Sequence, residues 1–374
     1  MFNGVKVLDV HSHIHDIPMI DRSQAPRLSY QFWHDLWYIQ GLGAAKPLPS
    51  PIAPGKHSDR PGNRDEDFQA VAAALAKYLE VRKIDAQIIS PHPLQFHGWM
   101  EDDIQFKSWI AYQNDLAFKI VQAKPDVFLG SCQLPQRANQ KDTEHCLEEL
   151  DRCVTELGFV AAYVSPDPNG KGNTPPMHSP YWFPLYQRCQ DLGVPIIVHG
   201  TDVVDPKFHA WEMNRYFEFG FMVPQSIAMA TLRQHPEVFE RFPGLRIIIC
   251  HCGGFIDRLG ENAAFRAKEH RDRVAGGLFF DTAAYDTDFL ALAIKQRGFT
   301  QFTFGTEAPG SGVEIRPGTN RTADDLVPMF ESDPALSFLT DEQKKDILHS
   351  TPARLAPGLA DAAAQNAKAR AKAY

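Results

Sequence analysis

The feature of this sequence that most constrains its fold is an alternation of short apolar runs with longer amphipathic stretches. Eight runs are rich in β-forming residues: Val5–Val10, Ala86–Ser90, Val127–Cys132, Phe159–Val164, Val194–Val198, Arg246–Cys250, Leu278–Asp281 and Gln301–Phe304. Helical patterns lie between many of them, at Asp65–Val81, Phe106–Ala123, Asp142–Leu157, Trp182–Leu192 and Pro224–Phe242. Such alternation is typical of βα units around a parallel sheet. Eight units predict an α/β fold of the closed (β/α)8 type, a TIM-like barrel, rather than an open sheet.

Two regions do not follow this repeat. Residues 17–64 form a long Pro-rich insertion after the first predicted strand, with aromatic residues that include Trp33. A long segment of this kind inside a compact domain is usually a lid or a binding loop, although it could equally cover barrel surface. Residues 356–374 form an Ala-rich tail that predicts a helix or a frayed end. We therefore expect one barrel domain over residues 1–355, with a lid insertion at 17–64, followed by the tail.

The overall composition excludes several classes of protein. The chain has 374 residues, of which 44% are hydrophobic and 22% charged, as in ordinary globular proteins. A net charge of −8 without a basic block argues against nucleic acid or an anionic membrane surface as a partner. Each apolar window is too short to span a bilayer. The first residues enter a strand directly, without a signal peptide, so we expect a cytoplasmic protein with six reduced cysteines.

Polar residues follow several of the predicted strands, where a barrel places its active site. His11 and His13 follow the first strand, and alternate side chains of a strand point the same way, so both can reach one cation. His199 ends the fifth strand, His251 ends the sixth, and Glu307 follows the eighth. Imidazole and carboxylate groups are ligands of divalent metals. The sequence therefore predicts a metal site on this rim of the barrel.

Other residues on the same rim are weaker candidates. Asp281 ends the seventh strand, where it could orient His251 or a metal ligand, or simply cap the next turn. His92 could line the pocket, and Tyr163 could stack on a planar substrate. Arg316 and other loop arginines could pair with a substrate carboxylate. A zinc site at the Cys-His-Cys sequence around His251 would need a second pair of ligands at finger-like spacing, which the sequence lacks.

These motifs resemble the amidohydrolase superfamily. The resemblance rests on Asp9-Val10-His11-Ser12-His13, on His199, and on the run Pro-Gly-Leu-Arg-Ile-Ile-Ile-Cys-His-Cys-Gly-Gly at 243–254. The segments 279–282 and 304–309 fit the last two strands of that family. The sequence is most similar to the branch related to α-amino-β-carboxymuconate-ε-semialdehyde decarboxylase, which includes decarboxylases, hydratases and lactone hydrolases. The resemblance covers nearly the whole chain apart from the insertion and the tail.

The resemblance implies a role for each of the rim residues. His11, His13 and His199 would be metal ligands, and His251 would be a histidine beside the metal that acts as acid, base or water activator. The family usually carries Asp after the eighth strand, whereas this chain carries Glu307. The branch that resembles 4-oxalomesaconate hydratase also has Glu there, which favours hydratase-like chemistry. The longer Glu307 side chain can still ligate, from a displaced position or as a bridge.

The number of metal ions depends on the available bridging ligands. Dinuclear members of the superfamily often use a Lys or Glu from the fourth strand, and residues 159–166 contain no Lys, Glu or Cys. We therefore expect one divalent ion, zinc in the first place, with manganese or iron as alternatives. A Glu307 bridge with His251 on a second metal keeps a dinuclear site open.

The expected function is that of a metal-dependent lyase, either a decarboxylase or a hydratase, acting on a small carboxylated substrate that is unsaturated or aromatic. The alternatives are a hydrolase of a lactone, amide or ester, a dinuclear iron or manganese oxygenase, and a barrel subunit that supports a catalytic partner. The resemblance also implies self-association into a homodimer or larger oligomer, with a hetero-oligomer as an alternative.

Overall fold

Seven parallel strands form one sheet in chain order in the computed structural model. The structure describes residues 1–14, 65–93, 96–98, 100–201, 217–254, 272–310, 312 and 314–373, so the predicted lid at 17–64 lies outside the described residues. The strands are β1 (Leu8–Asp9), β2 (Ala86–Ile89), β3 (Phe128–Gln133), β4 (Ala161–Val164), β5 (Ile196–Val198), β6 (Ile247–Ile249) and β7 (Leu278–Phe280).

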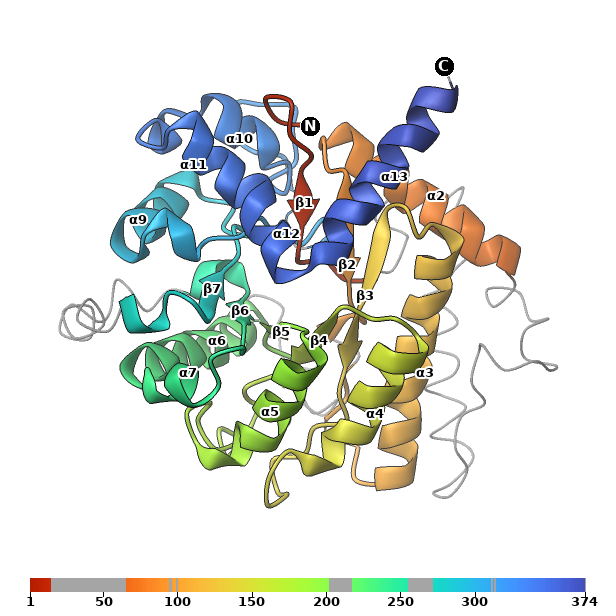
Figure 1. Ribbon diagram of the computed structural model, residues 1–374, viewed down its shortest axis with the longest axis vertical. Helices are drawn as coiled ribbons and strands as arrows, with labels where there is room; N and C mark the ends of the chain where they lie inside the picture. The colour runs from red at the N-terminus through yellow and green to blue at the C-terminus, as the bar shows by residue number, and fades with distance from the viewer. Residues whose placement is uncertain are drawn as a thin grey trace.

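The predicted eighth strand is an irregular segment that links β7 to β1. Phe302 forms a parallel bridge with Phe280, and the Thr303 amide donates to the Phe280 carbonyl at 2.9 Å. On the other side, the Val10 amide donates to the Phe304 carbonyl at 3.0 Å. The Phe304 amide donates instead to the Ile347 carbonyl, which interrupts the ladder and explains why a regular strand does not form. The curled sheet with its helices has the architecture of a TIM-like barrel (Figure 1).

Helices surround the strands (Figure 1). The predicted helix over 224–242 is divided in two near Pro236, because proline has no amide hydrogen to continue the helical ladder. The described α-helices are α2 (Asp65–Val81), α3 (Asp103–Ala123), α4 (Leu147–Asp151), α5 (Phe183–Leu192), α6 (Phe217–Gln234), α7 (Glu237–Arg241), α9 (Thr287–Arg297), α10 (Val327–Ser332), α11 (Asp341–Lys345), α12 (Thr351–Leu355) and α13 (Pro357–Ala373). Every helix among the described residues is too short or too polar to cross a bilayer.

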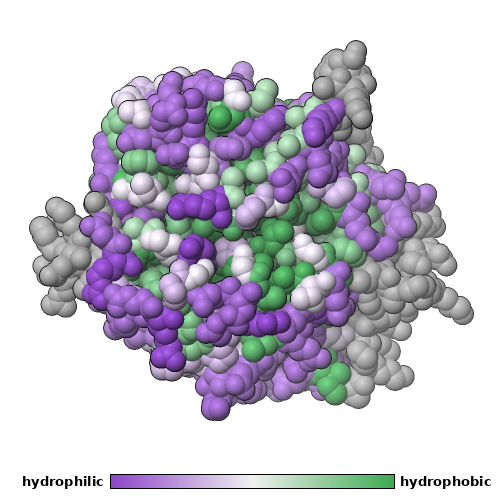
Figure 2. Space-filling model, in the orientation of Figure 1, coloured by the Kyte–Doolittle hydropathy of each residue, from purple (hydrophilic) through white to green (hydrophobic). Residues whose placement is uncertain are grey.

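The core has an outer layer between strands and helices and an inner layer inside the barrel. In β6, Ile247 and Ile249 belong to the outer layer, whereas Ile248 belongs to the inner one, as the alternation of a strand requires. The Ala-rich helix α13 joins the inner layer through Leu359, which is buried. The helix α13 contacts β1, β2 and β3 and lies beside them in Figure 1, and Figure 2 shows apolar side chains gathered at the centre of this face.

The C-terminal helix covers the end of the barrel opposite the predicted site. The Asn366 side chain donates to the carbonyl of Asp85, the residue directly before β2, at 3.0 Å. Because α13 packs where the strands begin, the rim where they end is left to the polar residues of the site. This arrangement follows the general rule that barrels use their two ends differently, one for stability and one for chemistry.

Candidate metal centre

Five of the predicted site residues meet at the carboxyl ends of the strands. His11 and His13 follow β1, His199 follows β5, His251 follows β6, and Glu307 follows the irregular eighth segment. Each side chain is buried, with at most 6% of the residue exposed. The structure therefore brings together residues separated by almost 300 positions in the sequence, as the barrel topology predicts.

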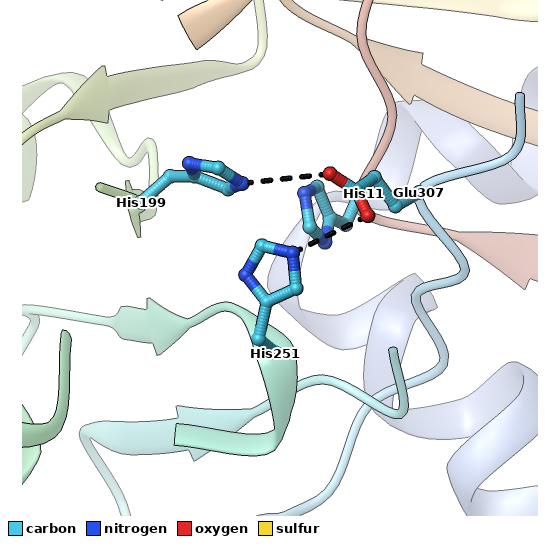
Figure 3. Close-up of side chains that lie close together, drawn as sticks. All are labelled: His11, His199, His251 and Glu307. Carbon is cyan, nitrogen blue, oxygen red and sulfur yellow. Dashed lines mark ion pairs between the residues drawn. The ribbon is translucent and has the colours of Figure 1, made fainter. Parts of the chain in front are cut away.

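The Glu307 carboxylate lies at the centre of the histidines. Its Oε1 is 3.7 Å from His13 Nε2 and 3.8 Å from His199 Nε2, and its Oε2 is 3.3 Å from His251 Nε2. Figure 3 shows His11, His199 and His251 converging on this carboxylate. Ligand atoms of these three histidines and Glu307 all lie within 4.8 Å of one another. Four ligands about 2.1 Å from one ion would lie about 3.4 Å apart, so groups at this spacing, with His13 Nε2 3.1 Å from His11 Nε2, can surround a single divalent cation.

The outward-facing ring nitrogens of the β1 histidines have partners that fix their orientation. His11 Nδ1 donates to Asp281 Oδ2 at 2.6 Å, and His13 Nδ1 lies 2.8 Å from Ser90 Oγ. The two Nε2 atoms therefore face the centre, where they lie 3.1 Å from each other. Metal-binding histidines commonly donate their second nitrogen to a carboxylate or a hydroxyl in this way.

The protonation states of the site also suit a cation. Burial and the neighbouring histidines lower the pKa of His13 well below its ordinary value. Burial lowers the pKa of His199 to about 4, against the opposing effect of Glu307, and its Nδ1 donates to the Gly200 carbonyl. Burial alone would raise the pKa of Glu307, but His251 and the other histidines lower it well below its ordinary value. Neutral imidazoles around an ionised carboxylate are the forms that bind metal.

A left-handed backbone at Glu307 places its long side chain. Its φ is +56°, and its amide donates to the His11 carbonyl at 2.8 Å, which ties the eighth segment to the end of β1. A Cβ at Gly310 would lie 2.1 Å from the Glu307 carbonyl oxygen, so this turn requires glycine. Tyr285 donates from its hydroxyl to Glu307 Oε2 at 2.6 Å. Tyr285 could not be predicted as a site residue, because it stands in the loop after β7 without a motif.

His251 stands in a left-handed turn. The φ angles of His251, Cys252, Gly253 and Gly254 are +50°, +57°, +74° and +76°. The side-chain amide of Gln225, from α6, holds the ring, with its Nε2 3.0 Å from His251 Nδ1. Gln225 is fully buried and was also missed, since a glutamine inside an amphipathic helix carries no sign of a role at a distant strand.

Asp281 contacts both sides of the site. Its Oδ2 accepts from His11, and its Oδ1 accepts from the Cys252 amide at 2.8 Å and from the Ala283 amide at 3.2 Å. The carboxylate therefore orients a predicted metal ligand and caps the local turn, two alternatives that the sequence left open. It contacts the backbone that carries His251.

The remaining candidates have mixed outcomes. The ring of Tyr163 stacks on His199, with centroids 5.6 Å apart, so it packs against the site. His92 is partly exposed, 5.7 Å from the ring of His13. Arg316 donates to the carbonyls of Tyr285 and Ala323, which engage its guanidinium and make it unsuitable as a substrate clamp. The other arginines suggested for this role lie outside the described residues, as does Trp33.

The cysteines form neither disulfides nor a finger-like site. All six are free and buried, and burial raises the pKa of both Cys250 and Cys252. Ligand atoms of Cys250, His11 and Asp281 lie within 4.8 Å of one another. Without a metal beside them, these thiols are therefore protonated at neutral pH.

Comparison with known proteins agrees with this architecture. The amidohydrolase family model matches residues 8–357. A 2-keto-4-carboxy-3-hexenedioate hydratase from Sphingobium sp. is 28% identical over 360 residues, which cover 94% of this chain and 96% of the hydratase. A 2-amino-3-carboxymuconate-6-semialdehyde decarboxylase from Dictyostelium discoideum is 26% identical over 251 residues, 63% of this chain and 66% of the decarboxylase.

The fold of this chain is also similar to that of a protein of known structure. The crystal structure of a 4-oxalomesaconate hydratase from Rhodopseudomonas palustris superposes with a TM-score of 0.74 at 25% identity, and the alignment covers 98% of this chain and 99% of that protein. The family model alone spans almost the whole sequence. The predicted resemblance is thus confirmed, and this chain belongs to the amidohydrolase family.

Proposed function

We propose that this protein is a metal-dependent lyase, in the first place a hydratase, that acts on a small unsaturated substrate carrying carboxylates. The observation that carries the proposal is the buried cluster in which the His13 and His199 imidazoles face Oε1 of an ionised Glu307, with His11 Nε2 3.1 Å from His13 Nε2. Two relatives that are 25–28% identical over nearly the whole chain are named as hydratases. A decarboxylase is the second candidate, favoured by the shorter alignment with the muconate-semialdehyde enzyme.

His11, His13, His199 and Oε1 of Glu307 would hold one divalent ion, zinc in the first place. When bound, such an ion lowers the pKa of a water ligand and polarises a carbonyl or carboxylate of the substrate. The hydroxyl of Tyr285 donates to Oε2 of Glu307, and Oε1 faces the imidazoles of His13 and His199. Because Oε2 already accepts from Tyr285, we assign the ion to Oε1, which supports one ion rather than two.

His251 would move the proton. Its Nε2 faces the centre of the site, 3.3 Å from Glu307 Oε2, while Nδ1 is held by Gln225. A side-chain amide can donate to the neutral ring or accept from the protonated one, so Gln225 can support both states of an acid–base group. With a reference pKa of about 6.5, a histidine can exchange a proton with a substrate carbon or a water near neutral pH.

Product assays test the proposal. A hydratase should remove the absorbance of a conjugated keto-dicarboxylate without gas release, whereas CO2 release would assign a decarboxylase. Ring opening of a lactone would identify the hydrolase alternative, and oxygen uptake would identify the dinuclear oxygenase. Either of the last two results, with no turnover in the lyase assays, would overturn the lyase proposal.

We also propose that the partner is a small molecule and that the chain associates as a homodimer or larger. The net charge of −8 supports a small-molecule substrate over nucleic acid. Light scattering of the purified protein measures the mass of the particle, and a second polypeptide copurifying in fixed ratio would instead indicate a hetero-oligomer.

A further inference from the structure

The turn that carries His251 needs support from outside itself. His251 and Cys252 both adopt left-handed φ angles, of +50° and +57°. Side chains with a Cβ rarely adopt this conformation, and such residues persist only where the surrounding structure holds them. The partners of this turn therefore decide where the His251 ring lies.

Two buried charges of opposite sign hold the peptide groups of Cys252. Asp281 accepts from its amide at 2.8 Å, and Arg297 donates from Nη1 to its carbonyl. Asp281 is 0% and Arg297 1% exposed. Hydrogen bonds with charged groups are stronger than those between neutral groups, and more so away from water. Both the amide and the carbonyl of Cys252 are thus held by a buried charged group.

Arg297 is built into its position. It is the last residue of α9, and its guanidinium lies over the ring of Phe280, 4.4 Å from the centroid. A Cβ at residue 253 would lie 2.8 Å from Arg297 Nη1, so Gly253 leaves the space that the guanidinium occupies. Burial lowers the pKa of Arg297 to about 10, which keeps it charged at neutral pH.

We propose that Arg297 is a positioning residue for His251, which holds the left-handed turn so that the imidazole faces Glu307. Asp281 grips the same residue from the other side and also accepts from His11. Arg297, Cys252, Asp281 and His11 therefore form a buried chain from the acid–base histidine to a metal-binding one. The catalytic meaning of this chain rests on the proposed function, whereas its effect on the turn does not.

Hydrogen exchange of the turn tests the proposal without a substrate. In the full-length, metal-containing protein, Arg297→Met should speed exchange of the amides at 252–254 by about tenfold or more, since bonds to charged groups contribute on this scale. Arg297→Lys keeps the charge but loses the planar fork, so it should give an intermediate rate. Unchanged exchange in both variants would overturn the proposal.

A matched control separates this effect from general destabilisation. Arg82 is also buried, follows a helix, and lies over an aromatic ring, that of Tyr78, but it bonds to Asp324 instead of the turn. Arg82→Met should lower the melting temperature while leaving exchange at 252–254 unchanged. If Arg297→Met does not fold, Arg297→Lys alone decides, with wild-type exchange at the turn as the contradicting result.

The catalytic consequence is measured separately. With a substrate in hand, Arg297→Met should keep its metal and its KM and lose kcat by about tenfold to a hundredfold, and its pH profile should shift because the His251 ring is displaced. Rescue of kcat by Arg297→Lys would support positioning. Altered exchange with unchanged kcat and pH profile would contradict a role in catalysis, whereas absence of any lyase activity in the wild type would count against the proposed function alone.

Discussion

The two oxygens of Glu307 have different surroundings. Oε1 faces His13 and His199, whereas Oε2 faces His251 and accepts from Tyr285. The backbone of Glu307 is left-handed, with a φ of +56°, and carries this carboxylate among the histidines. We therefore expect Oε1 to be the oxygen that binds the ion, and Oε2 to remain with Tyr285 and His251.

Two histidine variants should separate metal binding from catalysis. His199→Ala removes a nitrogen that faces Oε1 and should abolish metal binding, measured as metal per chain after dialysis. His251→Ala should keep the metal and lose activity, because its ring is assigned to proton transfer. Loss of metal from both variants would make His251 a ligand and favour a dinuclear site.

Tyr285→Phe removes one hydroxyl beside the proposed metal. Without this hydrogen bond the Glu307 carboxylate can rotate, so we expect metal affinity to fall by about tenfold to a hundredfold, as for other partners of ligands. Competition with a chelator measures the affinity. Tyr181→Phe is the control, since its hydroxyl donates to the Arg137 carbonyl, and it should bind metal as the wild type does. Equal affinities would show that Tyr285 does not orient Glu307.

The buried histidines should make the metal-free protein sensitive to acid. The pKa of His199 is about 4 in the folded state, against about 6.5 in an unfolded chain, so the unfolded chain takes up the proton first. The free energy of unfolding should therefore be constant above about pH 6.5 and fall as the pH decreases toward 4. Urea denaturation across this range measures it, and His199→Gln should flatten the slope. If the free energy of unfolding of His199→Gln depended on pH as the wild type does, groups other than His199 would cause the acid sensitivity.

At the scale of elements, the helix α13 closes the barrel end opposite the site. Leu359 is fully buried in the inner core, so Leu359→Ala should lower the free energy of unfolding by about 2–5 kcal/mol. Gln365 lies on the exposed side of the same helix, and Gln365→Ala should change stability little. Equal effects of the two variants in urea denaturation would mean that α13 does not stabilise the barrel.

The strands and the histidines at their ends could be predicted because local sequence carries them. Apolar runs mark the strands, and a barrel brings their carboxyl ends together, which placed His11, His199 and Glu307 on one rim. The irregular eighth segment could not be predicted, since the Phe304 amide is diverted to Ile347, more than forty residues later. The roles of Gln225, Tyr285 and Arg297 could not be predicted either, because these roles depend on tertiary contacts.

For the whole molecule, the barrel keeps stability and chemistry at opposite ends. The inner core and α13 occupy the end where the strands begin, and the buried cluster around Glu307 occupies the other. Family membership over residues 8–357 places the chain among enzymes whose named relatives include hydratases and a decarboxylase. We propose that one such barrel catalyses the lyase reaction with a single divalent ion and with His251 as the acid–base group.

Metal analysis of the protein as purified tests that proposal most directly. Elemental analysis against protein concentration should find about one divalent ion per chain, zinc in the first place, because Oε1 of Glu307 faces His13 and His199, whereas Oε2 accepts from Tyr285 and faces His251, the proposed acid–base group. Two equivalents of iron or manganese per chain would contradict the mononuclear site and the lyase mechanism built on it.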